Sequence, residues 1–268
     1  MALPPPAEGS AALVTGASSG IGVEIARELA ARGHALILVA RRQKLLEELA
    51  AELEAEHGVS VDPVAADVAD PKGRDALSAH VTEVGTRIEV LVNNAGVGGF
   101  GNFHEVARDR EVGMVRLNIE AVVDLTSRWL PQMVERGRGA LITIASTAAF
   151  QPMPNNATYA ATKAFVLNHC EAVAEELKGT GVSMTAICPG PVRTPFVETA
   201  GAGNEASSVP DFAWLEAHEV ARVAVEGAEN GSRVVVPGML NRATALAGRH
   251  TPRSILLPLT RRAMDRLR

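Results

Sequence analysis

The chain has 268 residues, of which 47% are hydrophobic and 21% charged, with a net charge of −5. This length and composition suit one large α/β domain with a sizeable core and argue against global disorder. The negative charge and an aromatic content of 3% argue against nucleic acid as a partner, because phosphate backbones require basic surfaces and unpaired bases require aromatic platforms.

Short apolar segments alternate with helical patterns along the whole chain. Residues 1–9 contain three consecutive prolines and are expected to form a disordered lead-in. The segments with strand character are residues 11–15, 35–40, 59–66, 88–92, 140–145, 182–188 and 233–236. The segments with helical character are residues 21–32, 43–57, 71–84, 112–135, 157–177 and 215–229.

The strand segments consist mainly of Val, Ile, Leu and Ala, as in sheets that are buried on both faces. Strands joined by helical crossovers form parallel sheets. Residues 10–240 are therefore predicted to form a single-domain, Rossmann-like, doubly wound α/β fold, with about seven parallel strands flanked by helices.

The composition also bears on location and on metal binding. No apolar run is long enough to span a membrane, and the first ten residues lack the basic start of a secretory signal, so a cytoplasmic location is expected. Cys170 and Cys188 lack metal-ligand spacing, so no metal site is predicted; both are expected to be reduced, and a disulfide between them stays open. His34 and three other helix-associated histidines are expected at the surface.

A glycine-rich turn follows the first strand, where residues 13–22 read LVTGASSGIG. Gly16 permits a tight turn, and Gly20 and Gly22 are expected to leave room for a pyrophosphate at the following helix N-terminus. Backbone N–H groups of the turn would then bind the anion; the turn also includes Ser18, Ser19 and Ile21. An ordinary glycine-rich turn is the alternative. Gly96, Gly98 and Gly101 also match GxGxxG, but no helix pattern starts there, so this segment is predicted to be a loop.

The end of the second strand indicates which dinucleotide is bound. A carboxylate at this place would bind the ribose hydroxyls of NAD(H). The sequence instead continues with Arg41 and Arg42, and guanidinium groups suit a ribose 2′-phosphate. NADP(H) is therefore the predicted cofactor, with Arg41 the main contact, while NAD(H) and a solvated arginine pair remain alternatives.

Tyr159 and Lys163 are four residues apart on a predicted helix and hence lie on one face of it. A free tyrosine has a pKa of about 10, and a nearby ammonium group favours its phenolate. Tyr159 can then exchange a proton with a carbonyl or alcohol oxygen, and Ser146 can hydrogen-bond the same oxygen. A core tyrosine beside a surface lysine is the alternative interpretation.

The motifs occur in one fixed order along the chain. They are the glycine turn, Asn93-Asn94-Ala95-Gly96 after the fourth strand, Asn118 in a long helix, Ser146, the Tyr159 and Lys163 pair, and Pro189-Gly190 after the sixth strand. In this order the chain resembles the classical short-chain dehydrogenase/reductase family over about residues 10–240.

The resemblance implies a role for each catalytic candidate. Ser146 would orient the substrate oxygen and Tyr159 would be the general acid/base. Lys163 would hold the nicotinamide ribose and lower the pKa of Tyr159. Asn118 would hold a water that links Lys163 to solvent, although an exposed helix asparagine is the alternative.

The resemblance also implies cofactor contacts along the carboxyl edge of the sheet. Asp67 and Val68 would border the adenine, Asn94 would brace the central strands, and Ala95 and Gly96 would border the cofactor. The nicotinamide carboxamide would meet Pro189, Gly190, Val192 and Thr194. Tyr159 and Lys163 would also contact the cofactor.

Two segments after the sixth strand are the least regular. Residues 195–214 are expected to form a substrate lid; they are partly apolar and contain no Lys or Arg, which favours an apolar ketone or acyl substrate. The tail, residues 241–268, is basic: residues 240–268 carry seven Arg and one Asp, a net +6 that leaves −11 for the rest. Pro252 and Pro258 are expected to interrupt any long amphipathic helix, so packing is favoured over contact with an anionic membrane.

The predicted function is an NADP(H)-dependent oxidoreductase that interconverts a small-molecule ketone and a secondary alcohol. Family members commonly assemble, so a homodimer or homotetramer is expected. The alternative of another class is a catalytically silent nucleotide-binding regulator of the same fold. Loss of Tyr, Lys or Ser would mark such a regulator, and Tyr159, Lys163 and Ser146 are all present.

Overall fold

A computed structural model of the chain describes residues 3–201 and 210–265. Its central strands are β1 (Ser10–Thr15), β2 (Leu36–Ala40), β3 (Val61–Ala65), β4 (Arg87–Asn93), β5 (Gly139–Ile144), β6 (Val182–Ile187) and β9 (Val234–Val235). They form one parallel sheet in the order β3-β2-β1-β4-β5-β6-β9. The chain proceeds outward from β1 in one direction and from β4 in the other. The predicted doubly wound parallel fold of about seven strands is therefore confirmed.

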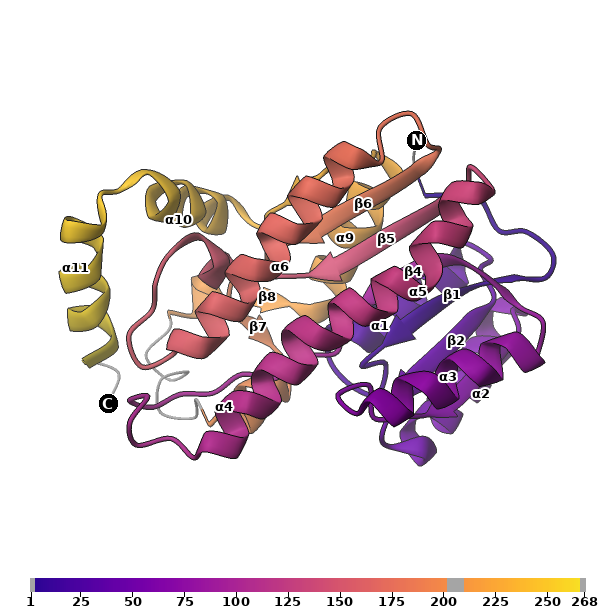
Figure 1. Ribbon diagram of the computed structural model, residues 1–268, viewed down its shortest axis with the longest axis horizontal. Helices are drawn as coiled ribbons and strands as arrows, with labels where there is room; N and C mark the ends of the chain where they lie inside the picture. The colour runs from indigo at the N-terminus through magenta and orange to yellow at the C-terminus, as the bar shows by residue number, and fades with distance from the viewer. Residues whose placement is uncertain (1–2, 202–209, 266–268) are drawn as a thin grey trace.

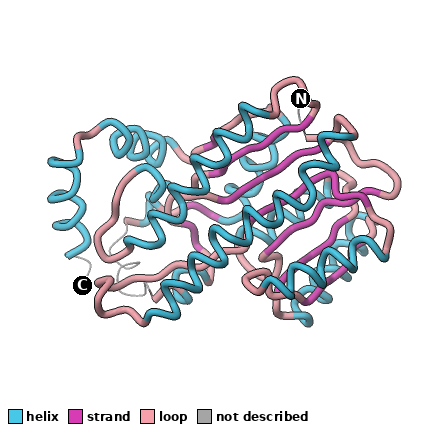
Figure 2. Tube along the Cα trace, in the orientation of Figure 1, coloured by secondary structure: helices cyan, strands magenta, loops and turns pink. Residues whose placement is uncertain are grey.

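Helices cover both faces of the sheet (Figures 1 and 2). The helices on one face are α1 (Ile21–Ala31), α2 (Gln43–His57) and α9 (Ala217–Glu229). Those on the other face are α3 (Pro71–Glu83), α5 (Ala121–Glu135) and α6 (Ala157–Glu176). Alternate residues of β1 enter the two cores, Ala12 and Val14 in one and Ala11 and Leu13 in the other. Burial on both faces explains why the strands are mainly apolar.

The long helix predicted at residues 112–135 has an irregular centre. It consists of α4 (Arg108–Val115), a π-helical turn at Arg116–Glu120 and then α5. A π-turn widens a helix locally and is frequent at functional sites. Here it contains Asn118, whose side chain is only 1% exposed, so the exposed-asparagine alternative is wrong.

The segment after β5 and the lid contain several short elements. A 3₁₀ turn η2 (Thr147–Phe150) leads toward α6. Beyond β6 lie β7 (Val192–Arg193), α7 (Phe196–Thr199), the 3₁₀ turn η3 (Asp211–Ala213) and β8 (Leu215–Glu216), which pairs with β7. The predicted helix at 215–229 therefore begins at residue 217. Residues 202–209 of the predicted lid lie outside the described residues.

The N-terminal segment differs from the disordered lead-in that the prolines predict. Residues 3–9 lie against the body: the Leu3 N–H donates to the Ala228 carbonyl at 3.1 Å, and Arg87 donates to the Glu8 carbonyl at 2.6 Å. Proline fixes the backbone without internal hydrogen bonds, so such a segment is stiff. Its exposed carbonyls can then be bound by arginines of the domain.

The C-terminal segment forms two helices, α10 (Met239–His250) and α11 (Arg253–Asp265). In Figure 1 α11 projects from the body at the end of the chain. Pro252 separates the two helices, but Pro258 lies inside α11, so the expectation that it would interrupt the helix is wrong. Pro258 removes one backbone hydrogen bond, and water can satisfy the freed carbonyl of an exposed helix.

Some titratable groups are more deeply buried than their positions in the sequence indicate. His34 is 4% exposed, so its expected surface position is wrong; it follows the end of α1, and burial lowers its pKa. Cys170 and Cys188 are free and buried, and burial raises the pKa of both thiols to about 12. No described helix has the length and apolar character needed to cross a membrane.

Candidate active site

A cavity of about 930 Å³ lies at the carboxyl ends of the strands, the place where doubly wound sheets bind ligands. Its wall contains most of the predicted site residues, namely Gly16, Ser18, Ser19, Gly20, Ile21, Arg41, Arg42, Asp67, Val68, Asn94, Ala95, Gly96, Ser146, Tyr159, Lys163, Pro189, Gly190, Val192 and Thr194. Gly22 and Asn118 are the two that do not line it. Residues that follow the carboxyl ends of strands β1 to β6 therefore line one cavity.

The glycine turn has the conformation that glycine permits, but Gly22 has a different role from the predicted one. Gly16 has a φ of +70° and Gly20 a φ of +59°, values that other residues rarely adopt. A Cβ on Gly22 would lie 2.4 Å from the Gly16 carbonyl oxygen and 2.5 Å from Asn94 Nδ2. Gly22 therefore allows the start of α1 to pack against the turn and Asn94, and does not itself clear the cavity.

Asn94 and Thr15 join the two central strands below the turn. Asn94 Nδ2 donates to the Thr15 carbonyl at 2.8 Å, and the Asn94 N–H donates to Thr15 Oγ1 at 3.0 Å. Thr15 Oγ1 in turn donates to the Val92 carbonyl. These bonds tie β1 to β4 where the strand order reverses, so the floor of the cavity is rigid.

The two arginines after β2 differ in their contacts. Arg42 donates to the Ser18 hydroxyl from Nη2 at 2.9 Å and to the Ser18 carbonyl at 3.1 Å. Arg41 is exposed at the cavity wall and makes no hydrogen bond or ion pair to another described residue. Arg41 is therefore the guanidinium available to a ligand, while Arg42 braces the glycine turn.

Tyr159, Ser146 and Lys163 lie together at the other end of the cavity. Ser146 follows β5 and caps η2, accepting a hydrogen bond from the Ala148 N–H at 3.1 Å. Its hydroxyl also lies near enough to Tyr159 to lower the pKa of that phenol. Lys163 Nζ lies 5.8 Å from the Tyr159 ring centroid and donates to the Ile144 carbonyl at 2.7 Å. Lys163 is 5% exposed, so the surface-lysine alternative is wrong.

Burial is the main influence on the pKa values of Tyr159 and Lys163. It raises the pKa of Tyr159 above its usual value, and the neighbouring Ser146 hydroxyl opposes that rise. Burial also lowers the pKa of Lys163 to about 8. The net pKa of Tyr159 is thus raised by burial, and the lowering by Lys163 that the resemblance implies stays a prediction. At neutral pH the phenol is protonated, which is the state that can donate a proton.

Asn118 lies behind the cavity wall and holds a loop. Its Nδ2 donates to the Val97 carbonyl at 2.9 Å and to Thr162 Oγ1 at 3.1 Å, while its Oδ1 accepts from the Val97 N–H at 3.0 Å. A Cβ on Gly96 would lie 3.3 Å from Asn118 Oδ1 and 3.6 Å from Lys163 Nζ. Asn118 therefore lies close to Lys163, with Gly96 beside both.

The cavity wall around Tyr159 is largely apolar. The Phe196 ring in α7 lies 5.9 Å from the Tyr159 ring. Phe100, Met114, Met153 and Trp214 also line the cavity. Arg110, which lies outside the lid, also lines the cavity and adds a positive charge to its wall. Arg110 donates a hydrogen bond to the Ala200 carbonyl at 2.5 Å. This end can therefore hold an apolar molecule, with polar groups near Tyr159 and at Arg110.

Sequence reasoning missed several residues that support the site. Thr162 binds Asn118, Arg110 holds the end of α7, and Asn241 in α10 packs against Gly190. A Cβ on Gly190 would lie 2.2 Å from Asn241 Oδ1. These contacts join residues far apart in the sequence, and no local pattern marks them.

Comparison with known proteins agrees with this geometry. The family model for short chain dehydrogenases matches residues 10–205. The putative ketoacyl reductase 1 of the granaticin polyketide synthase from Streptomyces violaceoruber is 40% identical over 190 residues, 70% of this chain and 69% of that protein.

Two solved structures are similar over most of their length. A short-chain dehydrogenase from Sphingobium yanoikuyae in complex with NADPH is 33% identical, with a TM-score of 0.80 and coverage of 93% of this chain and 95% of that one. A variant of the actinorhodin polyketide ketoreductase with NADPH is 34% identical, with a TM-score of 0.76 and coverage of 87% and 97%. The chain belongs to the short-chain dehydrogenase family and is an oxidoreductase.

Proposed function

We propose that the protein interconverts an apolar ketone and the corresponding secondary alcohol with NADP(H), and that Tyr159 is the general acid/base. The observation that carries this proposal is that Tyr159, Ser146 and buried Lys163 line one cavity, with Lys163 Nζ 5.8 Å from the Tyr159 ring centroid. These groups would surround a carbonyl oxygen at a point where a protonated phenol can donate to it.

The residues present fit a dinucleotide phosphate. Gly16 and Gly20 shape a turn at the α1 N-terminus, where backbone N–H groups favour a pyrophosphate. Arg41 is available for the 2′-phosphate, and the structural neighbour from Sphingobium yanoikuyae was solved with NADPH. When bound, the cofactor supplies or accepts the hydride.

Three side chains would handle the proton and the substrate oxygen. In the reducing direction Tyr159 Oη gives its proton to that oxygen, while Ser146 Oγ donates a second hydrogen bond and fixes its position. Lys163 supplies positive charge beside the phenolate that remains, which favours the loss of the proton. In the oxidising direction Tyr159 takes the proton back.

The apolar wall supports an apolar substrate. Phe196 lies against Tyr159, and Met153 and Trp214 line the same cavity. The Streptomyces violaceoruber relative is described as a putative ketoacyl reductase, which fits a carbonyl on an apolar chain. The direct test is NADPH oxidation with a panel of linear and cyclic ketones and small aldehydes. Turnover of longer ketones in preference to small aldehydes supports the proposal, and NADPH binding without turnover of any carbonyl supports the silent regulator.

Arg41 is expected to set the preference for NADP(H). Replacing Arg41 by Ala should lower the ratio of kcat/KM for NADPH to that for NADH by about 10- to 100-fold, because charge-assisted hydrogen bonds contribute about 1.5–3 kcal/mol. Arg42→Ala should weaken both cofactors together, since Arg42 holds Ser18. Arg27→Ala, which removes a surface pair with Glu52 on α1 and α2, is the control. Equal use of both cofactors by the wild-type enzyme would refute the role of Arg41.

We further propose that the protein is a cytoplasmic homodimer or homotetramer. Exposed apolar side chains support a subunit interface, among them Val134 in α5 and Phe165 in α6. The basic C-terminal tail is proposed to pack on another subunit or on the lid, and either is favoured over contact with an anionic membrane. Leu246 and Ile255 are exposed on its two helices and support such packing.

A further inference from the structure

One buried cation lies outside the candidate site but touches its wall. Arg74 in α3 is 3% exposed. Its Nη1 donates to the Val68 carbonyl at 2.8 Å and to the Ala69 carbonyl at 3.4 Å. Val68 and Ala69 line the cavity on the same side as Arg41. A buried guanidinium is stable only when its donors are well paired, so these contacts constrain the loop as well as Arg74.

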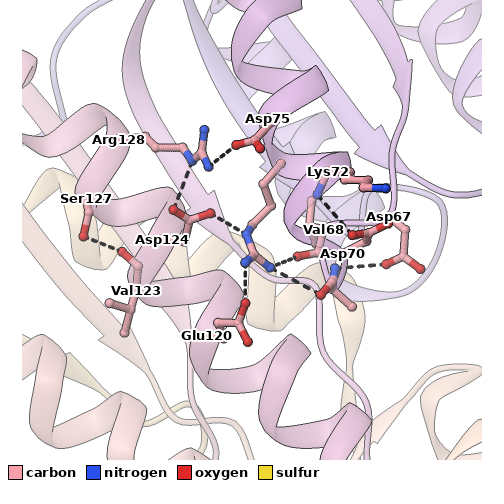
Figure 3. A network of polar contacts seen from close by, with 12 residues as sticks. Asp67, Val68, Asp70, Lys72, Asp75, Glu120, Val123, Asp124, Ser127 and Arg128 are labelled. Carbon is pink, nitrogen blue, oxygen red and sulfur yellow. Dashed lines mark hydrogen bonds and ion pairs between the residues drawn. The ribbon is translucent and has the colours of Figure 1, made fainter.

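Two carboxylates hold Arg74 from the opposite side. Arg74 Nη2 pairs with Glu120 in the π-turn, and its Nε pairs with Asp124 in α5. Asp124 also pairs with Arg128, which in turn pairs with Asp75. Figure 3 shows Glu120, Asp124 and the Val68 carbonyl around one guanidinium group. Arg74 thus links the cavity wall to the helix that carries Asn118.

The residue before Arg74 touches the same loop by its backbone. A Cβ on Gly73 would lie 2.2 Å from the Asp67 carbonyl oxygen, so only glycine allows α3 to approach this closely. Asp67 Oδ1 accepts a hydrogen bond from the Ala69 N–H at 3.0 Å. Gly73 and Arg74 therefore fix the Asp67, Val68 and Ala69 backbone from the side of α3.

We propose that Arg74 is a positioning residue for cofactor binding. By holding the Val68 and Ala69 carbonyls away from the cavity, it sets the wall that would face the adenosine half of NADP(H). This inference rests on the proposed function, because it takes that cavity as the cofactor site. Arg74 touches neither substrate nor nicotinamide, so its loss should weaken binding of the cofactor and leave the chemical step intact.

The test compares Arg74→Met with Arg128→Met in the full-length protein. Each substitution removes one of the two arginines that pair with Asp124. Of these two arginines, only Arg74 contacts the loop of Val68 and Ala69. NADPH affinity is measured from the change in its fluorescence on binding, and the melting temperature is measured alongside. The dissociation constant for NADPH should rise about tenfold or more in Arg74→Met and stay within twofold of wild type in Arg128→Met.

Two further variants test the idea should Arg74→Met fail to fold. Arg74→Lys keeps the charge and should recover part of the affinity. Gly73→Ala raises the helix propensity of α3, but its Cβ should displace the loop of Asp67, Val68 and Ala69. This variant should therefore weaken NADPH binding while the Arg74 ion pairs remain. NADPH affinity within twofold of wild type in Arg74→Met or in Gly73→Ala, or an equal loss in Arg128→Met, would overturn the inference alone. A wild-type protein that does not bind NADPH would overturn the proposed cofactor, and this inference with it.

Discussion

Replacing Tyr159 by Phe is expected to lower kcat/KM for ketone reduction by about 1000-fold, within the range for removal of a general acid. The substitution deletes the one hydroxyl that can give a proton to the substrate oxygen. The ring stays, and with it the contact with Phe196 at 5.9 Å. The measurement is initial velocity with the best ketone of the panel under saturating NADPH.

The same variant should leave the rest of the site intact. NADPH affinity and melting temperature should change little, because the ring stays in place and only its hydroxyl is removed. The control is Ser127→Ala, which removes a hydroxyl from the exposed side of α5. This variant should reduce the ketone at the wild-type rate. Retention of even a tenth of wild-type activity by Tyr159→Phe would show that another group supplies the proton.

Lys163→Met is expected to lower kcat/KM by about 100- to 1000-fold, the range for loss of one preorganised electrostatic donor. Its effect on stability should depend on pH. The pKa of Lys163 is lowered to about 8 in the folded protein, below its value of about 10.4 in an unfolded chain. Between these values the unfolded chain binds more protons, so the wild type gains stability as pH rises.

The variant lacks this titration. From pH 7 to pH 10 the wild type should gain about 2 kcal/mol in free energy of unfolding relative to Lys163→Met. The measurement is urea denaturation of both proteins at each pH, with exposed Lys178→Met as the control. A constant difference in stability across this range would show that Lys163 keeps an ordinary pKa.

The parts of the fold that follow from local chemistry were predictable. The central strands are apolar because both faces are covered, and α2 matches its predicted range because Gly58 ends it in a left-handed conformation. The glycine turn and the Tyr159 and Lys163 spacing also depend on residues close together in the sequence. The loop at Gly96–Gly101 was recognised because no helix pattern follows it.

The rest depends on contacts between distant residues. Asn118 is buried because a π-turn directs it to Val97 and Thr162, and no local pattern predicts such a turn. Arg74 looks like a surface residue of a polar helix until Glu120 and Asp124 are placed opposite it. The pKa of Lys163 depends on burial, which the spacing of Tyr159 and Lys163 does not reveal.

The most direct test of the account is the fate of the hydride with wild-type enzyme and Tyr159→Phe. NADPH carrying deuterium at both C4 positions is incubated with a ketone from the panel, and the alcohol is analysed by mass spectrometry. The proposed mechanism predicts one deuterium on the carbinol carbon with the wild type, and a yield about 1000-fold lower in the same time with Tyr159→Phe. Alcohol without deuterium, or equal yields from the two proteins, would contradict it.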